Sequence, residues 1–466
     1  MNQDVQHIHF VTGKLAEQAV RTIVAEVAER YQFEYSIGVM PITVAALMTP
    51  KWLLRHIEIP PQASRVVLPG HLQRELPLLQ QTLGAHVACG PRDIRDLPMF
   101  FGSKRERAQD YGEHSIEIIA EINHAPQLSL DELRGQARQL ADDGADLIDL
   151  GCTPGYRWTQ VADAVSSLVD DNLRISIDSF DPWEVATACR AGAELVLSVN
   201  SSNRAAAIDW QTEVVAIPDT PGDKKSFAET INFLLDHQVT VRLDPILEPL
   251  AGGFTDSLLR YAECRRDYPA ARIMMGIGNI TELTDVDSAG INTLLLGICQ
   301  ELNIQSVLTT QVINWARSSV RECDLARRLM HFAIKHRIPP KNLEPMLVIL
   351  RDTKLKSHSA EVLASLAANI RDNNIRLFAN DGKVHALSAG VHVSDPDPFM
   401  AMEQLLASSV GDSINVEHAF YLGFEMAKAM TANILGKHYE QDQPLDWGFL
   451  THSEPRHRLK RRRRKS

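Results

Sequence analysis

Between residues 116 and 308 the sequence repeats one pattern eight times: a short apolar run precedes, in most of the steps, a segment of helical periodicity. Strands that alternate with amphipathic helices pair in parallel, because a parallel connection needs a crossover. Eight such steps predict a closed (β/α)8 barrel, which we place at residues 114–338. A doubly wound open sheet is the alternative, and the even spacing disfavours it. The expected strands are 116–122, 147–150, 174–177, 195–199, 214–217, 239–243, 273–275 and 306–308.

The first hundred residues alternate in the same way over fewer steps. They predict an N-terminal doubly wound α/β domain, residues 1–100, with a parallel sheet. Its strand-to-helix loops contain Gly13 and Gly70 but no G-x-G-x-x-G, so these glycines are interpreted as turn residues. Residues 90–98 (GPRDIRDLP) are interpreted as a linker. The expected strands of this domain are 7–11, 33–37, 65–68 and 85–88.

The pattern changes after residues 339–340, which are both proline. Two apolar runs flank an Asn-Asp-Gly sequence at 380–382, which predicts a hairpin with an Asp-Gly turn. Helices are expected at 398–407 and 419–434, so we assign residues 341–456 to a small α+β domain. Residues 457–466 contain the basic run LKRRRRK, and a solvated tail is expected there because like charges gain no burial.

The composition is that of a globular protein, with 44% hydrophobic and 23% charged residues. The formal net charge of -11 argues against a general nucleic-acid binder. No signal peptide opens the sequence, and no apolar run approaches the roughly 18 residues that span a bilayer. The six cysteines are scattered without a C-x-x-C pair, which fits reduced thiols and offers no metal site. We therefore expect a cytoplasmic protein with no membrane segment and no metal.

Polar residues follow most of the predicted barrel strands, at the end where such barrels carry their chemistry. There they are costly unless they are paired or meet a ligand. A carboxylate can accept two parallel N–H bonds from an aminopyrimidinone edge, and a carboxamide can donate and accept at once. A single Asp in this position is often only a cap or turn residue. Six polar residues on one rim favour a site for a flat heterocycle: Asn123, Asp149, Asp178, Asn200, Asp244 and Asn279.

Several of these segments resemble the pterin-binding superfamily of dihydropteroate synthases and folate-dependent corrinoid methyltransferases. The resemblance covers about residues 114–335 and is carried by GADLIDLG (144–151), ISIDS (175–179), EIN (121–123), SVN (198–200) and LDP (243–245). It implies that four residues hold the pterin ring, with Asp149 nearby; the four are Asn123, Asp178, Asn200 and Asp244.

The whole chain also resembles a narrower group, the dihydropteroate-synthase-like proteins of methanogens and methylotrophic bacteria. The segment 90–98, the loop GIGNITELT at 276–284 and the C-terminal domain carry this second resemblance. It implies a role in tetrahydromethanopterin-type one-carbon metabolism.

The loops depart from the synthase pattern where a synthase needs cations for a pyrophosphate leaving group. Residues 151–155 (GCTPG) lack the family's Arg, 279–282 (NITE) lack its Lys, and 309–314 (TTQVIN) lack its Arg-x-His. Arg157 or Arg317 could substitute for these cations, but neither lies at the family's position. The loop with Asn279 instead resembles the methyltransferase branch, in which the matching Asn assists protonation of the pterin N5. We therefore assign catalytic roles to Asn279 and to Asp149.

We expect a pterin-dependent transferase whose ligand is a reduced pterin of tetrahydromethanopterin or tetrahydrofolate type. A true dihydropteroate synthase using 4-aminobenzoate is the first alternative, and a non-catalytic pterin carrier or assembly subunit is the second. The N-terminal domain lacks the D-x-H-x-x-G signature of corrinoid modules. A methyl acceptor would therefore be a corrinoid or other one-carbon protein acting in trans. A homodimer is among the oligomeric states that the sequence allows.

Overall fold

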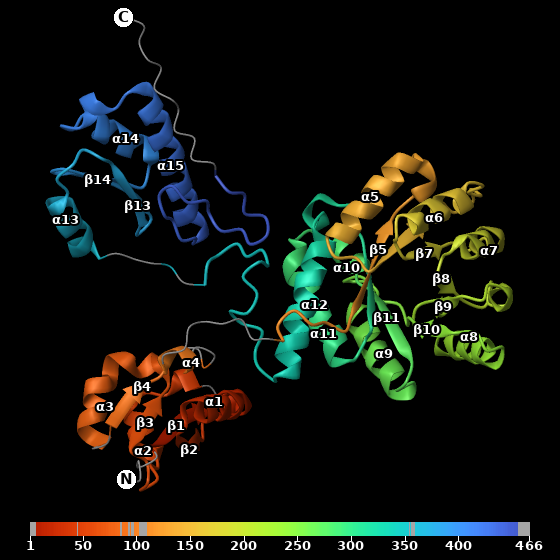
Figure 1. Cartoon of the computed structure of the whole chain (residues 1–466), viewed down its shortest axis with the longest axis horizontal. Helices are drawn as coiled ribbons and strands as arrows, with labels where there is room; N and C mark the ends of the chain where they lie inside the picture. Colours follow the sequence, from red (N-terminus) through yellow and green to blue (C-terminus); the bar gives the residue numbers. More distant parts are fainter. Residues whose placement is uncertain are drawn as a thin grey trace, which may run out of the picture. The chain divides into compact units, whose positions relative to one another are not determined.

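A computed structural model describes residues 6–43, 45–83, 86–91, 94, 97–101, 110–353, 355 and 359–454. The chain divides into two compact units, Met1–Leu343 and Glu344–Ser466. The first unit contains two separate sheets, one of four strands and one closed barrel, and the second contains a three-stranded sheet (Figure 1). Within the described ranges, no helix is both long and apolar enough to cross a membrane. The basic run at 459–465 lies outside the described residues.

The central segment forms the closed parallel barrel that the eightfold alternation predicts, with β12 pairing back onto β5. Every strand lies within two residues of its predicted bounds. Short β-branched and apolar runs form these strands because both faces of a parallel barrel strand are buried. The strands are β5 (Glu117–Ile122), β6 (Leu147–Gly151), β7 (Ile175–Asp178), β8 (Leu195–Val199), β9 (Glu213–Ala216), β10 (Val241–Leu243), β11 (Arg272–Gly276) and β12 (Ser306–Thr309).

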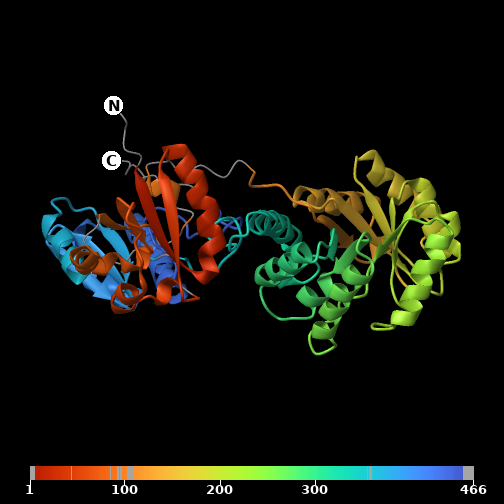
Figure 2. The same ribbon diagram turned by 90° about the horizontal axis from the view of Figure 1, so that it is seen from below.

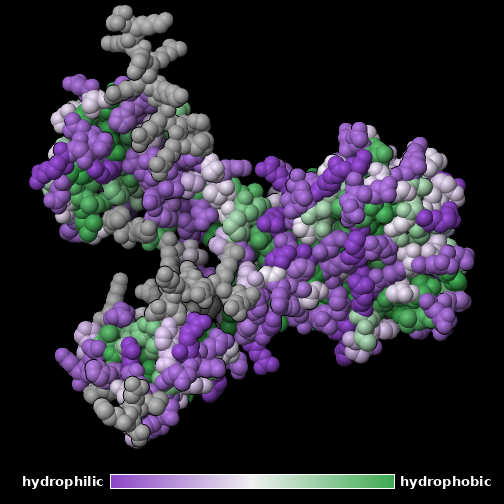
Figure 3. All heavy atoms as spheres, viewed as in Figure 1, coloured by the Kyte–Doolittle hydropathy of each residue, from purple (hydrophilic) through white to green (hydrophobic). Residues whose placement is uncertain are grey.

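Helices surround the barrel, as Figures 1 and 2 show. Side-chain caps begin three of them: Ser129 and Glu132 form a capping box, Asp181 caps a helix whose first residue is Pro182, and Asp223 caps a third helix. Their apolar faces pack on the outer faces of the strands in one large cluster. On the face seen in Figure 3, the outer surface of the barrel is largely hydrophilic. The helices are α5 (Leu130–Asp142), α6 (Val161–Asp170), α7 (Pro182–Ala191), α8 (Lys224–Asp236), α9 (Phe254–Asp267), α10 (Gly278–Glu282), α11 (Ser288–Glu301) and α12 (Ser319–Lys335).

The N-terminal sheet is parallel, with strand order β2-β1-β3-β4. Both faces of β1 are covered, because Val11 packs in one apolar cluster and Phe10 in another. The elements are β1 (His7–Gly13), α1 (Glu17–Tyr31), β2 (Glu34–Met40), α2 (Pro50–His56), β3 (Arg65–Leu68), α3 (Leu76–Leu83), β4 (His86–Cys89) and α4 (Leu97–Phe100).

The prediction of a linker at 90–98 is wrong at its C-terminal end. Leu97 begins helix α4 and is fully buried in the same cluster as Phe10, so this residue belongs to the core of the N-terminal sheet. Four residues of the predicted linker, at positions 92, 93, 95 and 96, lie outside the described residues.

The second unit contains the predicted hairpin. Strands β13 (Arg376–Asn380) and β14 (Lys383–Ser388) pair antiparallel around Asp381 and Gly382, which both have positive φ, as a two-residue hairpin turn requires. Helices α14 (Pro398–Leu406) and α15 (Val416–Leu435) follow. Two further elements were not predicted from the sequence: helix α13 (Ala360–Asn369) and strand β15 (Val391–Asp395), which pairs with β14.

Candidate functional site

The barrel interior contains an apolar layer, and charged residues lie at both of its ends. Successive residues of a strand point to opposite faces, so the residue two positions after an interior residue also faces inward. Ile119 of β5 and Leu147 of β6 belong to the layer, and Glu121 and Asp149 therefore face inward at the C-terminal ends of these paired strands. The layer consists of Ile119, Leu147, Leu195, Leu197, Val215 and Met274.

Two further carboxyl groups face the same end of the barrel. Ser176 of β7 pairs in register with Asp149 and donates a hydrogen bond to it, so Asp178, two residues later, also faces inward. Asp244 directly follows β10 and is buried. Glu121, Asp149, Asp178 and Asp244, hereafter the carboxyl layer, thus follow the apolar layer toward the C-terminal rim.

Asp149 is the most buried member of the carboxyl layer. It is 0% exposed, its Oδ1 accepts the Ser176 hydroxyl at 2.7 Å, and its Oδ2 has no hydrogen-bond partner among the described residues. Burial raises the pKa of Asp149 well above its ordinary value, and the charges of Asp178 and Glu121 raise it further. The sequence left open that Asp149 is only a cap; its place inside the barrel is not that of a helix cap.

Glu121 is the member that the sequence analysis did not select. Burial raises the pKa of the Glu121 carboxyl to about 7, and the charges of Asp178 and Glu282 contribute. Its Oε1 lies 2.8 Å from the position that a Cβ on Gly151 would take. One sequence signal could have identified it. In the strand EIIAEI, Glu121 lies two residues after Ile119 and so points to the same face of the strand. If Ile119 faces the barrel interior, Glu121 does too.

Asp178 and Asp244 have protein partners that favour their charged forms. Burial raises the pKa of Asp178, and a hydrogen bond with Ser198 opposes that rise. Burial raises the pKa of Asp244 to about 6, although its Oδ1 accepts the Tyr261 hydroxyl at 2.6 Å and the Ile246 N–H at 2.7 Å. The Asp244 carboxyl is therefore held in a fixed orientation, with its Oδ2 left for a ligand.

The two predicted asparagines differ in what they offer. The Oδ1 atom of Asn123 is buried and has no hydrogen-bond partner in the described part of the chain. The Oδ1 atom of Asn200 accepts the Ser202 N–H at 3.0 Å and the Ser202 hydroxyl at 2.7 Å, so it stabilises its own turn. Asn123 is thus available as an acceptor, whereas Asn200 has only its amide nitrogen to offer.

Asn279 lies apart from this arrangement. It is exposed in the first turn of α10, and its Nδ2 donates to the carbonyl oxygen of Leu247 at 3.0 Å. This bond ties the loop after β11 to the loop after β10. Glu282, at the end of α10, accepts the hydroxyl of Thr310 and is the residue of this helix whose charge acts on Glu121.

Unpartnered polar atoms occur in β6 and in loops at this end of the barrel. Among the described residues, five buried side-chain atoms without a hydrogen-bond partner lie in β6, in the loops after β5, β6 and β12, or after α10. Because buried polar groups are costly when left unpaired, such a concentration is typical of a surface that binds a polar ligand. The atoms are Asn123 Oδ1, Asp149 Oδ2, Thr153 Oγ1, Thr284 Oγ1 and Gln311 Nε2.

The opposite end of the barrel is closed by ion pairs. Arg242 is 1% exposed and binds Glu117 at 2.8 Å and Glu213 at 2.9 Å, joining β10 to β5 and β9. These charges satisfy one another, unlike those of the carboxyl layer. The N-terminal end therefore contributes to barrel closure, and the C-terminal end is the candidate site.

Arg157, which lies in the loop between β6 and α6, is already engaged. Its Nε lies 2.7 Å from Asp181 Oδ2, and its guanidinium carbon lies 5.5 Å from the centroid of the Trp183 ring.

Within the described ranges, no group of three or more His, Cys, Asp and Glu residues is arranged to hold a metal ion.

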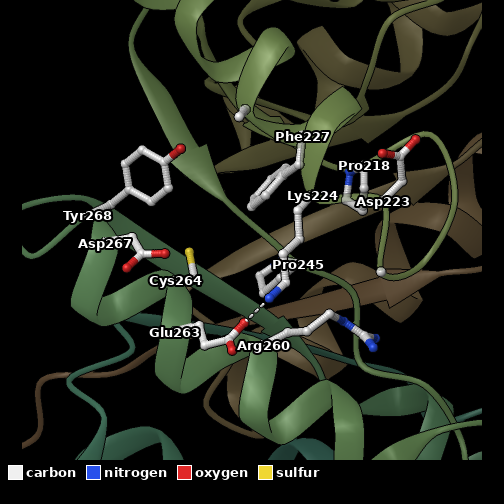
Figure 4. Close-up of a pocket in the computed structure, with 12 residues that line it drawn as sticks. Pro218, Asp223, Lys224, Phe227, Pro245, Arg260, Glu263, Cys264, Asp267 and Tyr268 are labelled. Carbon is white, nitrogen blue, oxygen red and sulfur yellow. Dashed lines mark hydrogen bonds and ion pairs between the residues drawn. The ribbon is translucent and has the colours of Figure 1, made fainter.

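A separate cavity of about 240 Å³ lies between α8 and α9 (Figure 4). Phe227 and Cys264 line it, and Lys224 pairs with Glu263 at 2.5 Å across it. Pro245 lines this cavity, but none of the four carboxyls does. It is therefore distinct from the carboxyl layer.

Residues 6–92 match a family of unknown function, DUF6513. The chain is 25% identical to an uncharacterized protein of Methanocaldococcus jannaschii, over 95% of this chain and 99% of that protein. Similar solved structures are dihydropteroate synthases. One, from Yersinia pestis with a pterine-sulfa conjugate, is 16% identical with a TM-score of 0.40, over 47% of this chain and 94% of that one. Another, from Xanthomonas albilineans with 7,8-dihydropteroate, is 18% identical with a TM-score of 0.38, over 48% of this chain and 95% of that one.

Proposed function

We propose that residues 114–338 bind a reduced pterin at the C-terminal end of the barrel and that the protein is a transferase of tetrahydromethanopterin- or folate-type one-carbon metabolism. The observation that carries this proposal is the carboxyl layer, whose members point inward beside the apolar layer. Two acceptor atoms at this end of the barrel have no hydrogen-bond partner among the described residues: Oδ2 of Asp149, a member of the layer, and Oδ1 of Asn123.

A pterin suits this surface because its two faces are apolar and one edge carries adjacent N–H donors. Asp178 and Asp244 would accept from that edge, and the Asp244 carboxyl is already oriented by hydrogen bonds to one of its oxygens. Asn123 would accept or donate at the mixed part of the edge. Asn200 would contribute its amide nitrogen alone, because its oxygen is used by Ser202.

Methyl transfer fits the site better than condensation with 4-aminobenzoate. A synthase must stabilise departing pyrophosphate, which needs cations aimed at the leaving group. Arg157, which lies in the loop after β6, is paired with Asp181. The carboxyl layer instead supplies protons and acceptors, which are what a reaction at a ring nitrogen requires.

The experiment has two parts. The protein purified from its native host is denatured, and the released small molecules are identified by mass spectrometry, which gives the pterin and its methylation state. Purified protein is then incubated with 5-methyltetrahydrofolate and cob(I)alamin, or with a dihydropterin pyrophosphate and 4-aminobenzoate, and products are separated by chromatography. We expect methyl transfer and little pteroate. Robust pteroate formation would contradict the methyltransferase assignment, and tight pterin binding without turnover in either assay would favour a carrier.

A further inference from the structure

We propose that Glu121 is a catalytic acid of this site, which gives a proton to the pterin N5 as the methyl group leaves. This inference rests on the proposed function and adds to it a residue, and a chemical step, that neither the strand-end motifs nor Asn279 supply.

The position of Glu121 is built by two strands. Glu121 faces the barrel interior from β5 and pairs in register with Asp149 of β6. Gly151, two residues further along β6, pairs with Asp178 of β7. Oε1 of Glu121 lies 2.8 Å from the position that a Cβ on Gly151 would take. The Glu121 carboxyl is therefore next to the last residue of β6, which pairs with Asp178. A glycine at 151 is what leaves room for it.

The groups around Glu121 favour the protonated form of its carboxyl. Asp149 of β6, Asp178 of β7 and Glu282 of α10 are the charged groups that face it, and all three are acidic. Three carboxyls on adjacent strands, one buried and two half-buried, do not all ionise readily near neutral pH, because like charges at short range disfavour each other's charged form. Burial, with the charges of Asp178 and Glu282, raises the pKa of Glu121 to about 7.

Of the three strand carboxyls, Glu121 is the one suited to exchange its proton with a ligand. Asp149 is fully buried and its Oδ1 is bonded to Ser176, so it is less accessible to a ligand than Glu121. Asp178 is bonded to Ser198 and is proposed to accept from the ring. Glu121 is only half-buried, and a pKa near 7 lets it both hold and release a proton at neutral pH.

The chemical step balances with one proton and one electron pair. The methyl carbon leaves N5 and bonds to a two-electron nucleophile such as cob(I)alamin, which supplies the electron pair of the new bond. The electrons of the broken N–C bond stay on N5. Without a proton N5 would leave as an amide anion, so the proton from Glu121 makes it a neutral N–H and leaves Glu121 as carboxylate. Asn279 has no titratable proton and could only hydrogen-bond.

The test uses Glu121→Gln, which keeps the size and hydrogen-bonding capacity of the side chain but cannot transfer a proton. Asp236→Asn, on the exposed face of α8, is the matched control. Methyl transfer from 5-methyltetrahydrofolate to cob(I)alamin is measured as a function of pH. We expect the wild-type and control rates to fall as the pH rises through about 7, and Glu121→Gln to be about 10²–10⁴-fold slower without that dependence. Its affinity for 5-methyltetrahydrofolate, measured by calorimetry, should change far less.

Two further measurements guard against a variant that is merely misfolded. Glu282→Gln removes one of the acidic neighbours, so the fall in rate should move to lower pH while the maximal rate is retained. Infrared difference spectroscopy of the ligand-free protein should show a carboxylic C=O band that disappears near pH 7 and is absent from Glu121→Gln.

The outcomes separate this inference from the function on which it rests. A Glu121→Gln protein with the wild-type rate and pH profile would overturn the assignment of Glu121 and leave the proposed function standing. A missing carboxylic band at Glu121 would do the same without any ligand. Wild-type protein that binds no 5-methyltetrahydrofolate or other reduced pterin would overturn both.

Discussion

The carboxylate of Glu121 occupies the space that a side chain on Gly151 would need, since its Oε1 lies 2.8 Å from the position of a Cβ on that glycine. The requirement for glycine at 151 is therefore one of packing and not of a left-handed backbone. Two residues on neighbouring strands are thus interdependent, and the carboxyl layer is specified partly by a residue that carries no functional group.

Gly151→Ala is accordingly expected to displace the Glu121 carboxyl without unfolding the barrel. The added methyl meets the end of a flexible side chain first and the Ile122 carbonyl oxygen at 3.3 Å, so we expect a stability loss of about 1–3 kcal/mol. Methyl transfer should fall by more than this loss explains. Urea unfolding and the transfer assay measure the two effects. Gly135→Ala, on the open surface of α5, is the control and should be neutral or stabilising.

Asp178→Ala and Asp244→Ala should each weaken pterin binding by about 1.5–3 kcal/mol, the range for a hydrogen bond to a charged group. The reason is their inward position at strand ends of the same rim. Calorimetric titration with 5-methyltetrahydrofolate gives the affinities, and circular dichroism verifies the fold. An unchanged affinity in a folded variant would remove that residue from the site.

Glu121→Gln should stabilise the protein at alkaline pH. The folded-state pKa of about 7 is above the unfolded value of roughly 4.3, so the contribution of this group to stability is full below pH 4.3 and is lost as the pH rises through 7. Gln cannot lose it. We expect the free energy of unfolding at pH 8 to exceed that of the wild type by about 1–3 kcal/mol and to match it near pH 4. Parallel curves at every pH would contradict a raised pKa.

Arg242→Met should destabilise the barrel while leaving the candidate site intact. Removing the guanidinium leaves Glu117 and Glu213 without their buried partner, at a cost of about 3–5 kcal/mol. Burial alone would raise the pKa of Glu117, but Arg242 and Arg174 outweigh it and lower that pKa. The wild type should therefore lose stability as the pH falls below roughly 4.3, and the variant should lose less. Urea unfolding at neutral and acid pH tests both statements.

Asn279→Ala should bind a pterin nearly normally and lose about 10²–10³-fold in methyl transfer, the usual effect of removing one preorganised hydrogen bond. In the ligand-free protein its side chain holds the carbonyl oxygen of Leu247, so the amide must exchange that bond to act on a ligand. Comparison of the binding constant with the single-turnover rate separates the two effects. Equal losses in both would assign Asn279 to loop positioning.

The barrel strands could be predicted from the sequence because both faces of each strand are buried, which produces unambiguous apolar runs. Strand β15 could not, because its sequence VHVSD ends in polar residues and its partner is an adjacent strand of a small sheet. Leu97 was missed because the surrounding charged and proline residues are typical of a linker, whereas its burial depends on contacts with β1.

Three members of the carboxyl layer were selected from the sequence alone. Asp178 and Asp244 directly end or follow apolar runs, so they could be found by position alone. Asp149 and Glu121 are each followed by a further apolar residue of their own strand, and only Asp149 was selected. The hydrogen bonds that occupy Asn200 and Asn279 depend on Ser202 and Leu247, and no spacing rule reveals such local competition.

The carboxyl layer belongs to the walls of the barrel and hardly at all to its loops. Glu121, Asp149 and Asp178 are strand residues held by backbone pairing, and Asp244 directly follows β10. Loops can lengthen, shorten or exchange sequence without altering that pairing. A lineage that keeps these strands could therefore retain the carboxyl layer while its βα loops diversify, and an engineer could graft foreign βα loops onto this barrel with the four carboxyls left in place.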